Sequence, residues 1–461
     1  MTEEVAEAGV EVAEKAVEDV MDPGAPPTPS TDAIIYVPGL AQRLLDQGID
    51  NIGRKMIGAL ERNSEDPADR YKLVDKGEIS YRDEYASGVR SLVREDAAGD
   101  RVVADLYELR YHQTLNKSFE DRSLLGKCLV VLMNLVGAIP AYGRAWRAKG
   151  KSKAEKAQLL IAAAMLFLIA GYFLVLVVTA AATAVQLLGL EQTAGEASQV
   201  TRAVAPDNAS SPVQNAAAEA GHAAPATGVL PWLQALVVLV AGLGALSRES
   251  LKELLSEAAT GVVATLGYLQ MADRKQSVVG QLTALLEQLL ERESPYRRVH
   301  LVTYSFGSVI ALDALFPQHQ PAAHLSRLDS LVTIGCPFDM IRIFWPEYFA
   351  RRQSRDGVPE HWYNIYSRFD LLSSNFRDDD QEAAADRALP VTGRTDAESV
   401  GPENFAYDIG IQMGRYQILG MLTVRGLQVH RLYWEGSGVT EMSCFDLVVP
   451  ALLASAEGPD V

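Results

Sequence analysis

Ser305 stands at the point where a short apolar strand is predicted to give way to a helix. The strand comprises residues 299–304, which are rich in Val and Leu, as a buried parallel strand requires. Apolar residues then recur at helical spacing between 309 and 315. A serine in such a turn lies at the N-terminus of a helix, whose dipole stabilises a developing negative charge. The pattern therefore indicates a nucleophilic serine.

The elements around Ser305 follow the order helix, strand, serine turn, helix. Upstream, the apolar residues between 278 and 290 lie on one helical face, and Pro295 marks the end of that helix. This order resembles the nucleophile elbow of the α/β-hydrolase superfamily, in its lipase and serine-esterase branch. Gly307 matches the elbow pattern, whereas Thr303 occupies the position of its first glycine. The resemblance implies a mostly parallel sheet with helices on both faces.

A serine hydroxyl is a weak nucleophile until a base takes its proton and an acid orients that base. In the superfamily the chain order is Ser, then Asp or Glu, then His. Asp370 follows an aromatic strand at 362–366, and His430 lies in a stretch similar to the His-x-x-Tyr-Trp segment of related esterases. The acids at 378–380 form a charge run that is typical of a solvated loop. The resemblance therefore implies a triad of Ser305, Asp370 and His430.

Two backbone amides are expected to bind the oxyanion. Residues 33–40 predict the first strand and its turn, and in the resembling family the residue after the corresponding His-Gly donates an N–H. Here Pro38 replaces that histidine and has no N–H. The expected donors are the amides of Leu40 and Phe306. A nucleophilic Cys336 is a competing hypothesis, but a cysteine at the end of a buried strand is usually inert.

The composition of the chain argues against several classes of partner and cofactor. The net charge of −17 argues against a nucleic-acid partner, and no basic face interleaved with aromatic residues is present. The three cysteines are far apart and odd in number, which suits a reducing compartment rather than a disulfide framework. Neither the cysteines nor the seven scattered histidines show metal-ligand spacing. We therefore expect no metal and no cofactor.

Two long apolar segments predict a membrane hairpin. Residues 157–190 are 34 consecutive uncharged residues, and residues 229–246 form a second, shorter apolar run. About 20 apolar residues suffice to cross a bilayer. The sequence between them, 191–228, is rich in Ala, Gly, Pro and Ser, as a loop would be. A further apolar run at 128–140 is too short to span and fits an interfacial or core helix better.

Topology and charge predict the orientation. The hydrolase-like segments, about 32–111 and 260–455, lie on both sides of the apolar insertion, so one shared sheet requires an even number of spans. Basic residues flank the insertion on the hydrolase side, whereas the loop 191–228 carries only Arg202. The positive-inside rule therefore places the hydrolase domain in the cytoplasm, the hairpin in the inner or plasma membrane, and the loop outside.

The predicted organisation has six parts. In chain order they are an acidic flexible tail (1–31), the first part of the hydrolase domain (32–127), an interfacial and basic juxtamembrane segment (128–156), the hairpin (157–247), the second part of the hydrolase domain (248–455) and a short tail (456–461). Within the first part, residues 42–100 are predicted to be mainly helical and residues 101–111 to form a strand.

Two functions fit these features. The resemblance implies hydrolysis of a carboxylic ester, and the apolar segments favour an acyl lipid or another lipophilic ester as substrate. The alternative is a membrane-anchored binding or signalling protein on a catalytically inactive hydrolase scaffold, which Thr303 and Pro38 favour and the complete Ser, Asp, His order opposes.

Overall fold

The computed structural model describes most of the predicted hydrolase domain. The described residues are 31–40, 46–82, 85–95, 99–112, 114–115, 121–147, 156, 159–160, 163, 171, 249–291, 294–319, 321–353, 358–370, 372–377, 401–407, 429–430, 432–434 and 442–453. The strands are β1 (Asp32–Val37), β2 (Tyr71–Tyr81), β3 (Tyr85–Arg94), β4 (Arg101–Glu108), β5 (Val299–Tyr304), β6 (Leu328–Ile334), β7 (His361–Tyr366) and β8 (Glu403–Ala406). The helices are α2 (Gln47–Asn63), α4 (Leu124–Arg147), α9 (Glu249–Gln270), α10 (Ala272–Leu290), α11 (Phe306–Leu315), α12 (Phe338–Phe344) and α15 (Val449–Leu453), with 3₁₀ turns η1 (Ala323–Arg327), η2 (Leu432–Trp434) and η3 (Cys444–Leu447).

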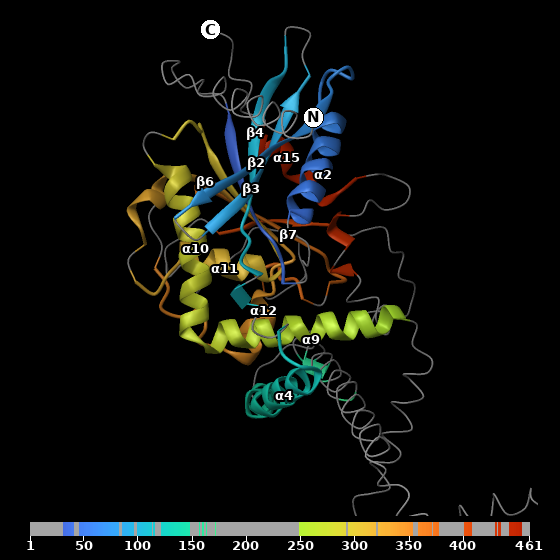
Figure 1. Ribbon diagram of the computed structural model, residues 1–461, viewed down its shortest axis with the longest axis vertical. Helices are drawn as coiled ribbons and strands as arrows, with labels where there is room; N and C mark the ends of the chain where they lie inside the picture. The colour runs from blue at the N-terminus through green and yellow to red at the C-terminus, as the bar shows by residue number, and fades with distance from the viewer. Residues whose placement is uncertain are drawn as a thin grey trace, which may run out of the picture.

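The described strands form one eight-stranded sheet in the order β2-β3-β4-β1-β5-β6-β7-β8. Within it, β3 runs antiparallel to its two neighbours, and the pairings from β4 through β8 are all parallel. β1 lies between β4 and β5, pairing Ile34 with Leu106 on one side and with His300 on the other. The two predicted parts of the hydrolase domain therefore share one sheet, and the predicted mostly parallel α/β architecture is confirmed (Figure 1).

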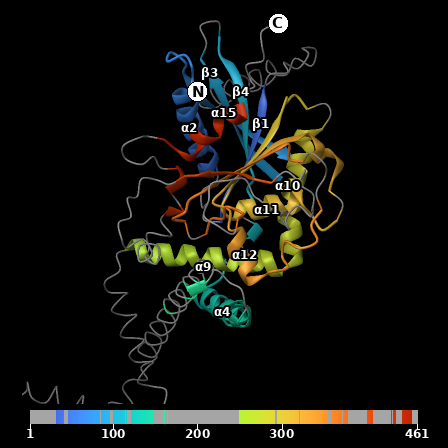
Figure 2. The same ribbon diagram turned by 180° about the vertical axis from the view of Figure 1, so that it is seen from behind.

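Helices cover both faces of the sheet (Figures 1 and 2). On one face, α2 packs with η3 and α15, and its buried Ile52 and Met56 belong to the same apolar cluster as Phe445 and Leu452. On the other face, α10 and α11 bury a second cluster that includes Leu285. Because both faces are covered, the central strands carry near-continuous apolar runs, as in β1, where every residue is buried.

The prediction that residues 42–100 are mainly helical is wrong beyond residue 63. The chain there forms the hairpin of β2 and β3, in which Tyr81 pairs with Tyr85 next to the turn. β2 lies at the edge of the sheet, and most of its residues are partly or fully exposed. A charged edge strand resists pairing with other chains, but it also lacks the apolar alternation by which a strand is recognised.

The predicted membrane hairpin at 157–247 and the tails 1–31 and 456–461 lie almost wholly outside the described residues. Among the described helices, α4 contains one stretch, Leu129–Arg147, that is long and apolar enough to cross a membrane by length and composition alone. The prediction that this region is too short is therefore wrong on length. The helix continues past Pro140 to its last turn, where Arg144 and Arg147 suit the partial negative charge of the C-terminus.

A buried ionic cluster lies at the edge where the parallel strands begin. His300 is fully buried, with Nε2 3.7 Å from an oxygen of Asp32 and Nδ1 3.3 Å from an oxygen of Asp329. Arg297 and Arg298 also contact Asp32, at 3.1 Å and 2.6 Å. Burial opposes the charged imidazolium, but the two carboxylates outweigh it and raise the pKa of His300 above its usual value. His300 therefore charges more readily in the folded protein than in the unfolded chain.

We expect His300→Gln to destabilise the protein in a pH-dependent way. A raised folded-state pKa contributes stability that is complete below the unfolded pKa and is lost as pH rises through the folded value. The variant should lose on the order of 1–3 kcal/mol of unfolding free energy at about pH 6, and less at about pH 9. Urea unfolding at both pH values measures this, and an equal loss at both would exclude the charged imidazolium as the cause.

Candidate active site

Ser305 occupies the sharp turn between β5 and α11. Its backbone has φ 53° and ψ −125°, a left-handed conformation that costs a non-glycine residue about 1–3 kcal/mol. The turn is held by the amide of Ser305, which donates to the carbonyl of Ile334 at 2.8 Å. Gly307 permits the close approach of α11 to β1, because a Cβ there would lie 2.3 Å from the Val37 carbonyl oxygen. The strain and the close approach both serve to present this one hydroxyl.

Three side chains that are far apart in the sequence meet at this turn. His430 Nε2 lies 2.7 Å from Ser305 Oγ, and His430 Nδ1 lies 2.7 Å from Asp370 Oδ2. Ser305 follows β5, Asp370 follows β7, and His430 comes after β8 along the chain. Asp370 and His430 are 5% and 9% exposed. The carboxylate can only accept, so the imidazole proton lies on Nδ1, and the Nε2 lone pair faces the serine hydroxyl.

The carboxylate of Asp370 is fixed by further hydrogen bonds. Its Oδ1 accepts the amide of Leu372 at 2.9 Å, and its Oδ2 accepts the hydroxyl of Tyr433 at 2.9 Å in addition to the histidine. Gly335, at φ 61°, leaves space for the imidazole, since a Cβ there would lie 3.1 Å from His430 Cε1. The acid and the base are thus held in one orientation before any substrate binds.

Two tyrosines that the sequence did not single out contact the histidine and the acid. The ring of Tyr304 stacks on the imidazole of His430, with 5.3 Å between centroids and 24° between planes, and its hydroxyl donates to the His430 carbonyl. Burial, and then the neighbouring Asp370, raises the pKa of the Tyr433 hydroxyl, which therefore stays protonated as a donor. The His-x-x-Tyr-Trp pattern contains Tyr433, which would have been the available signal.

We expect Tyr433→Phe to lower kcat for an ester substrate about tenfold and to leave KM unchanged. A hydrogen bond to a charged group contributes about 1.5–3 kcal/mol, and a loss of about 1.4 kcal/mol in the transition state is tenfold. Steady-state kinetics measures the split between kcat and KM. The matched control is Tyr407→Phe, because Tyr407 stacks on Tyr433 but its hydroxyl donates to the Met442 carbonyl, away from Asp370. Equal losses in both variants would contradict a specific role for the Tyr433 hydroxyl.

The turn after β1 lies directly beside the serine. A Cβ built on Gly39 would be 3.1 Å from Ser305 Cβ, and the carbonyl of Pro38 accepts the buried hydroxyl of Tyr111 at 2.7 Å. Leu40 follows this turn and packs on the core, and Phe306 is the first residue of α11. The residues expected to supply the oxyanion amides therefore flank Ser305 from two elements.

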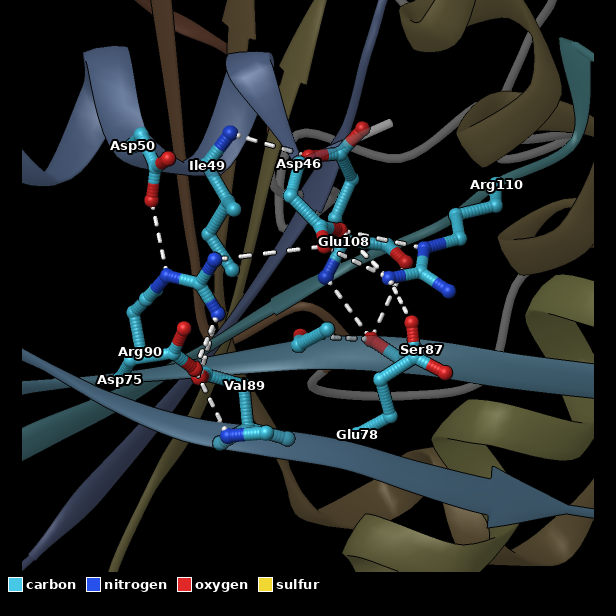
Figure 3. Close-up of polar contacts among 12 residues, drawn as sticks. Asp46, Ile49, Asp50, Asp75, Glu78, Ser87, Val89, Arg90, Glu108 and Arg110 are labelled. Carbon is cyan, nitrogen blue, oxygen red and sulfur yellow. Dashed lines mark hydrogen bonds and ion pairs between the residues drawn. The ribbon is translucent and has the colours of Figure 1, made fainter. Parts of the chain in front are cut away.

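The far end of this β1–α2 connection is tied to the β2–β3 hairpin by ion pairs (Figure 3). Asp46, which precedes α2 at φ 61°, accepts from Arg110 at 2.7 Å. Gly88 on β3 makes room for it, because a Cβ there would lie 2.4 Å from an Asp46 carboxylate oxygen. Arg110 also contacts Glu78 of β2 at 2.7 Å. The residue that precedes α2 is thus linked, through Arg110, to the β2–β3 hairpin that the sequence did not predict.

A second arginine extends this network to α2 itself. Arg90 of β3 contacts Asp50 at 2.8 Å and Asp75 at 2.7 Å. The buried carboxylate of Glu108, the last residue of β4, accepts the amide of Ile49 at 3.0 Å. Carboxylates near the first turn of a helix satisfy free amides and complement the helix dipole. The start of α2 is therefore held by charge as well as by packing.

The departures from the elbow pattern are accommodated locally. The Thr303 hydroxyl is fully buried and lies 2.9 Å from both the Val332 carbonyl oxygen and the Ser308 hydroxyl, so the extra polar atom is satisfied.

Cys336, the competing candidate for the nucleophile, is fully buried at the end of β6, and burial raises the pKa of its thiol. A raised pKa is the opposite of what a cysteine nucleophile requires.

Within the described part of the chain, no group of three His, Cys, Asp or Glu side chains is placed to hold a metal ion. The site is instead a serine, a histidine and a carboxylate in hydrogen-bonded sequence, an arrangement that can carry out nucleophilic acyl transfer. No family model, no curated protein and no solved structure matches this chain.

Proposed function

We propose that the chain is a membrane-anchored serine hydrolase of the α/β-hydrolase type that cleaves a carboxylic ester. The observation that carries the proposal is the chain of hydrogen bonds from Ser305 through His430 to Asp370, with 2.7 Å at each step. The strained backbone of Ser305 supports it, because such strain is concentrated at functional sites.

The proposed reaction has two halves. Ser305 Oγ attacks the ester carbonyl while His430 Nε2 takes the hydroxyl proton, and the oxyanion is held by the amides of Leu40 and Phe306. The tetrahedral intermediate collapses, His430 returns the proton to the leaving alkoxide, and an acyl-serine and an alcohol result. His430 then takes a proton from water as the water oxygen attacks the acyl-serine. The second tetrahedral intermediate collapses, His430 returns the proton to Ser305 Oγ, and the carboxylic acid leaves with the serine restored. Asp370 holds the imidazole in place and stabilises its protonated form.

The proposed substrate is an acyl lipid or another lipophilic ester, and the proposed anchor is the hairpin at 157–247. The support is compositional: the two apolar runs are long enough to cross a bilayer, and basic residues flank them on the hydrolase side. The proposed location is the inner or plasma membrane, with the hydrolase domain cytoplasmic and the loop 191–228 outside.

Labelling of the detergent-solubilised full chain with a fluorophosphonate probe tests the proposal, because the probe reacts with an activated serine and not with an ordinary one. We expect stoichiometric labelling that is lost when Ser305 is replaced. A folded wild-type protein that takes no label would favour the second candidate, a binding or signalling protein on an inactive scaffold, for which Thr303 and Pro38 are the supporting residues.

A further inference from the structure

Helix α4 carries a continuous exposed apolar face. Leu129 is 59% exposed, and Met133, Val136 and Ile139 are each 65% exposed. These residues recur at spacings of three and four, so they lie along one side of the helix. Trp146 is 53% exposed near the C-terminal end of the same helix. An exposed apolar patch of this kind marks an interaction surface.

The opposite side of α4 packs on the hydrolase domain. Val131 and Ala145 are 1% and 4% exposed, and Ala145 belongs to a buried cluster with Ile343 of α12. The ring of Tyr142 lies 6.3 Å from that of Phe344, also on α12. α4 contacts α9 as well, and it is the outermost of these helices in both views (Figures 1 and 2).

This position is on the active-site side of the sheet. α12 begins at Phe338, shortly after β6 ends, and between them lies Gly335, where a Cβ would be 3.1 Å from His430 Cε1. The carboxyl ends of parallel strands lie along one edge of a sheet, and Ser305 and Asp370 follow β5 and β7 at that same edge. The exposed face of α4 therefore lies on the same side of the molecule as Ser305, beyond the carboxyl ends of the parallel strands.

Charge and chain continuity indicate what covers this face. The stretch 144–156 carries six Lys or Arg residues and one Glu, in a chain whose net charge is −17. The uncharged run 157–190 follows it directly. An anionic bilayer surface attracts such a basic segment while it repels the rest of the chain. Aromatic residues such as Trp146 prefer the membrane–water interface.

We propose that α4 lies flat in the membrane interface, with Leu129, Met133, Val136 and Ile139 immersed, and thereby holds the active site against an anionic leaflet. The helix is a second membrane contact, separate from the proposed hairpin. The inference rests on the proposed function only in its consequence, that the ester is taken directly from the leaflet. The depth of α4 itself can be measured without turnover.

An orientation across the membrane is disfavoured by the partner of α4. The last two turns of α4, at Tyr142 and Ala145, pack on α12, which carries an ion pair between Arg342 and Asp339 at 3.6 Å. Side chains of both residues are partly exposed to water. A spanning α4 would place this pair at the boundary of the hydrocarbon, where charged groups already lose water at a cost. A helix lying in the interface leaves α12 in water.

Fluorescence quenching at Val136 measures the depth. Val136 lies near the middle of Leu129–Arg147, so a spanning helix would place it close to the bilayer midplane, whereas an interfacial helix places it roughly 5–10 Å into the headgroup and acyl boundary. The probe is an NBD label on Val136→Cys, in a Cys128→Ser background in which Cys336 and Cys444 are fully buried. The full chain is reconstituted in phosphatidylcholine–phosphatidylglycerol vesicles that contain nitroxide lipids.

We expect a nitroxide near the headgroup to quench the label more strongly than one near the end of the acyl chain. The matched control is the same label on Glu287→Cys, an exposed position on α10, and it should be quenched by neither lipid. Stronger quenching by the deep nitroxide would replace the proposal with a spanning helix. Absence of quenching at position 136 would overturn it in favour of a protein surface, either another segment of this chain or a second copy.

The catalytic consequence is tested separately. Val136→Glu should lose turnover of a lipid ester in vesicles and keep turnover of a short water-soluble ester, whereas Val136→Leu should keep both. Loss of both activities in the glutamate variant would mean damage to the fold, and equal retention of both would overturn the delivery of substrate by α4. A wild-type chain without either activity would refute the proposed function and leave the depth measurement intact.

Discussion

Replacing Ser305 by alanine is expected to abolish ester hydrolysis and fluorophosphonate labelling while leaving the fold unchanged. The substitution removes only the side-chain hydroxyl group. Without it the site has no nucleophile and can form no covalent intermediate. By comparison with known serine hydrolases, kcat should fall by a factor on the order of 10⁵–10⁶, with a residual activity from the oxyanion amides. Kinetics with a short soluble ester measures the loss.

The control for this variant is Ser326→Ala. The hydroxyl of Ser326 donates to the Ala323 carbonyl in the exposed turn η1, which precedes β6, whereas Ser305 lies at the other end of that strand. The same substitution there should therefore leave activity and labelling intact. The unfolding transition of Ser305→Ala should match that of wild type, because alanine inherits the strained backbone. Full labelling of Ser305→Ala would falsify the assignment of the nucleophile.

Replacing Asp370 by asparagine is expected to lower kcat about 10⁴-fold with little change in structure. An amide at this position can donate to His430 Nδ1, which would force the imidazole proton onto Nε2, opposite the serine hydroxyl. The base could then no longer accept the serine proton. The hydrogen bonds that Asp370 accepts from Leu372 and Tyr433 would also be weakened, since a neutral carbonyl oxygen replaces a carboxylate.

The comparison that makes this result specific is Asp379→Asn, in the acidic run at 378–380. That run is the other acidic segment between the serine and the histidine that could have supplied the carboxylate. We expect its amide variant to keep wild-type kcat. The reverse outcome, a large loss of kcat at 379 and a small one at 370, would show that the acid lies in the run at 378–380 and not at Asp370.

The position of α4 gives the substrate proposal a physical basis beyond composition. A lipophilic ester partitions into the bilayer, so an enzyme that must take it from water meets very little of it. A site held against the leaflet meets the ester at its membrane concentration. The exposed apolar face of α4 and the basic stretch that follows it would supply that contact by burial of apolar surface and by attraction to anionic lipid.

The sequence by itself determined the features whose physics is local. The apolar run of β5, the turn at Ser305 and the apolar spacing of α11 lie within eighteen consecutive residues, 298–315, and each is set by propensity and periodicity along the chain. The mostly parallel sheet is expected from the resemblance of this stretch to the nucleophile elbow of α/β-hydrolases, which the apolar run of β5 supports. The long uncharged run at 157–190 is likewise read directly from the residues, although its structure lies outside the described part of the chain.

Only the tertiary structure decided what depends on residues far apart in the chain. The stacking of Tyr304 on His430 and the donation from Tyr433 to Asp370 join segments separated by up to 126 positions, and no local pattern encodes such contacts. The β2–β3 hairpin escaped the sequence because an edge strand needs charged residues and so loses its alternation. Glu78 of this hairpin nevertheless shares Arg110 with Asp46, the residue that precedes α2. Periodicity reports which side chains seek the core, whereas the mutual placement of polar groups is settled only when the strands that carry them pair.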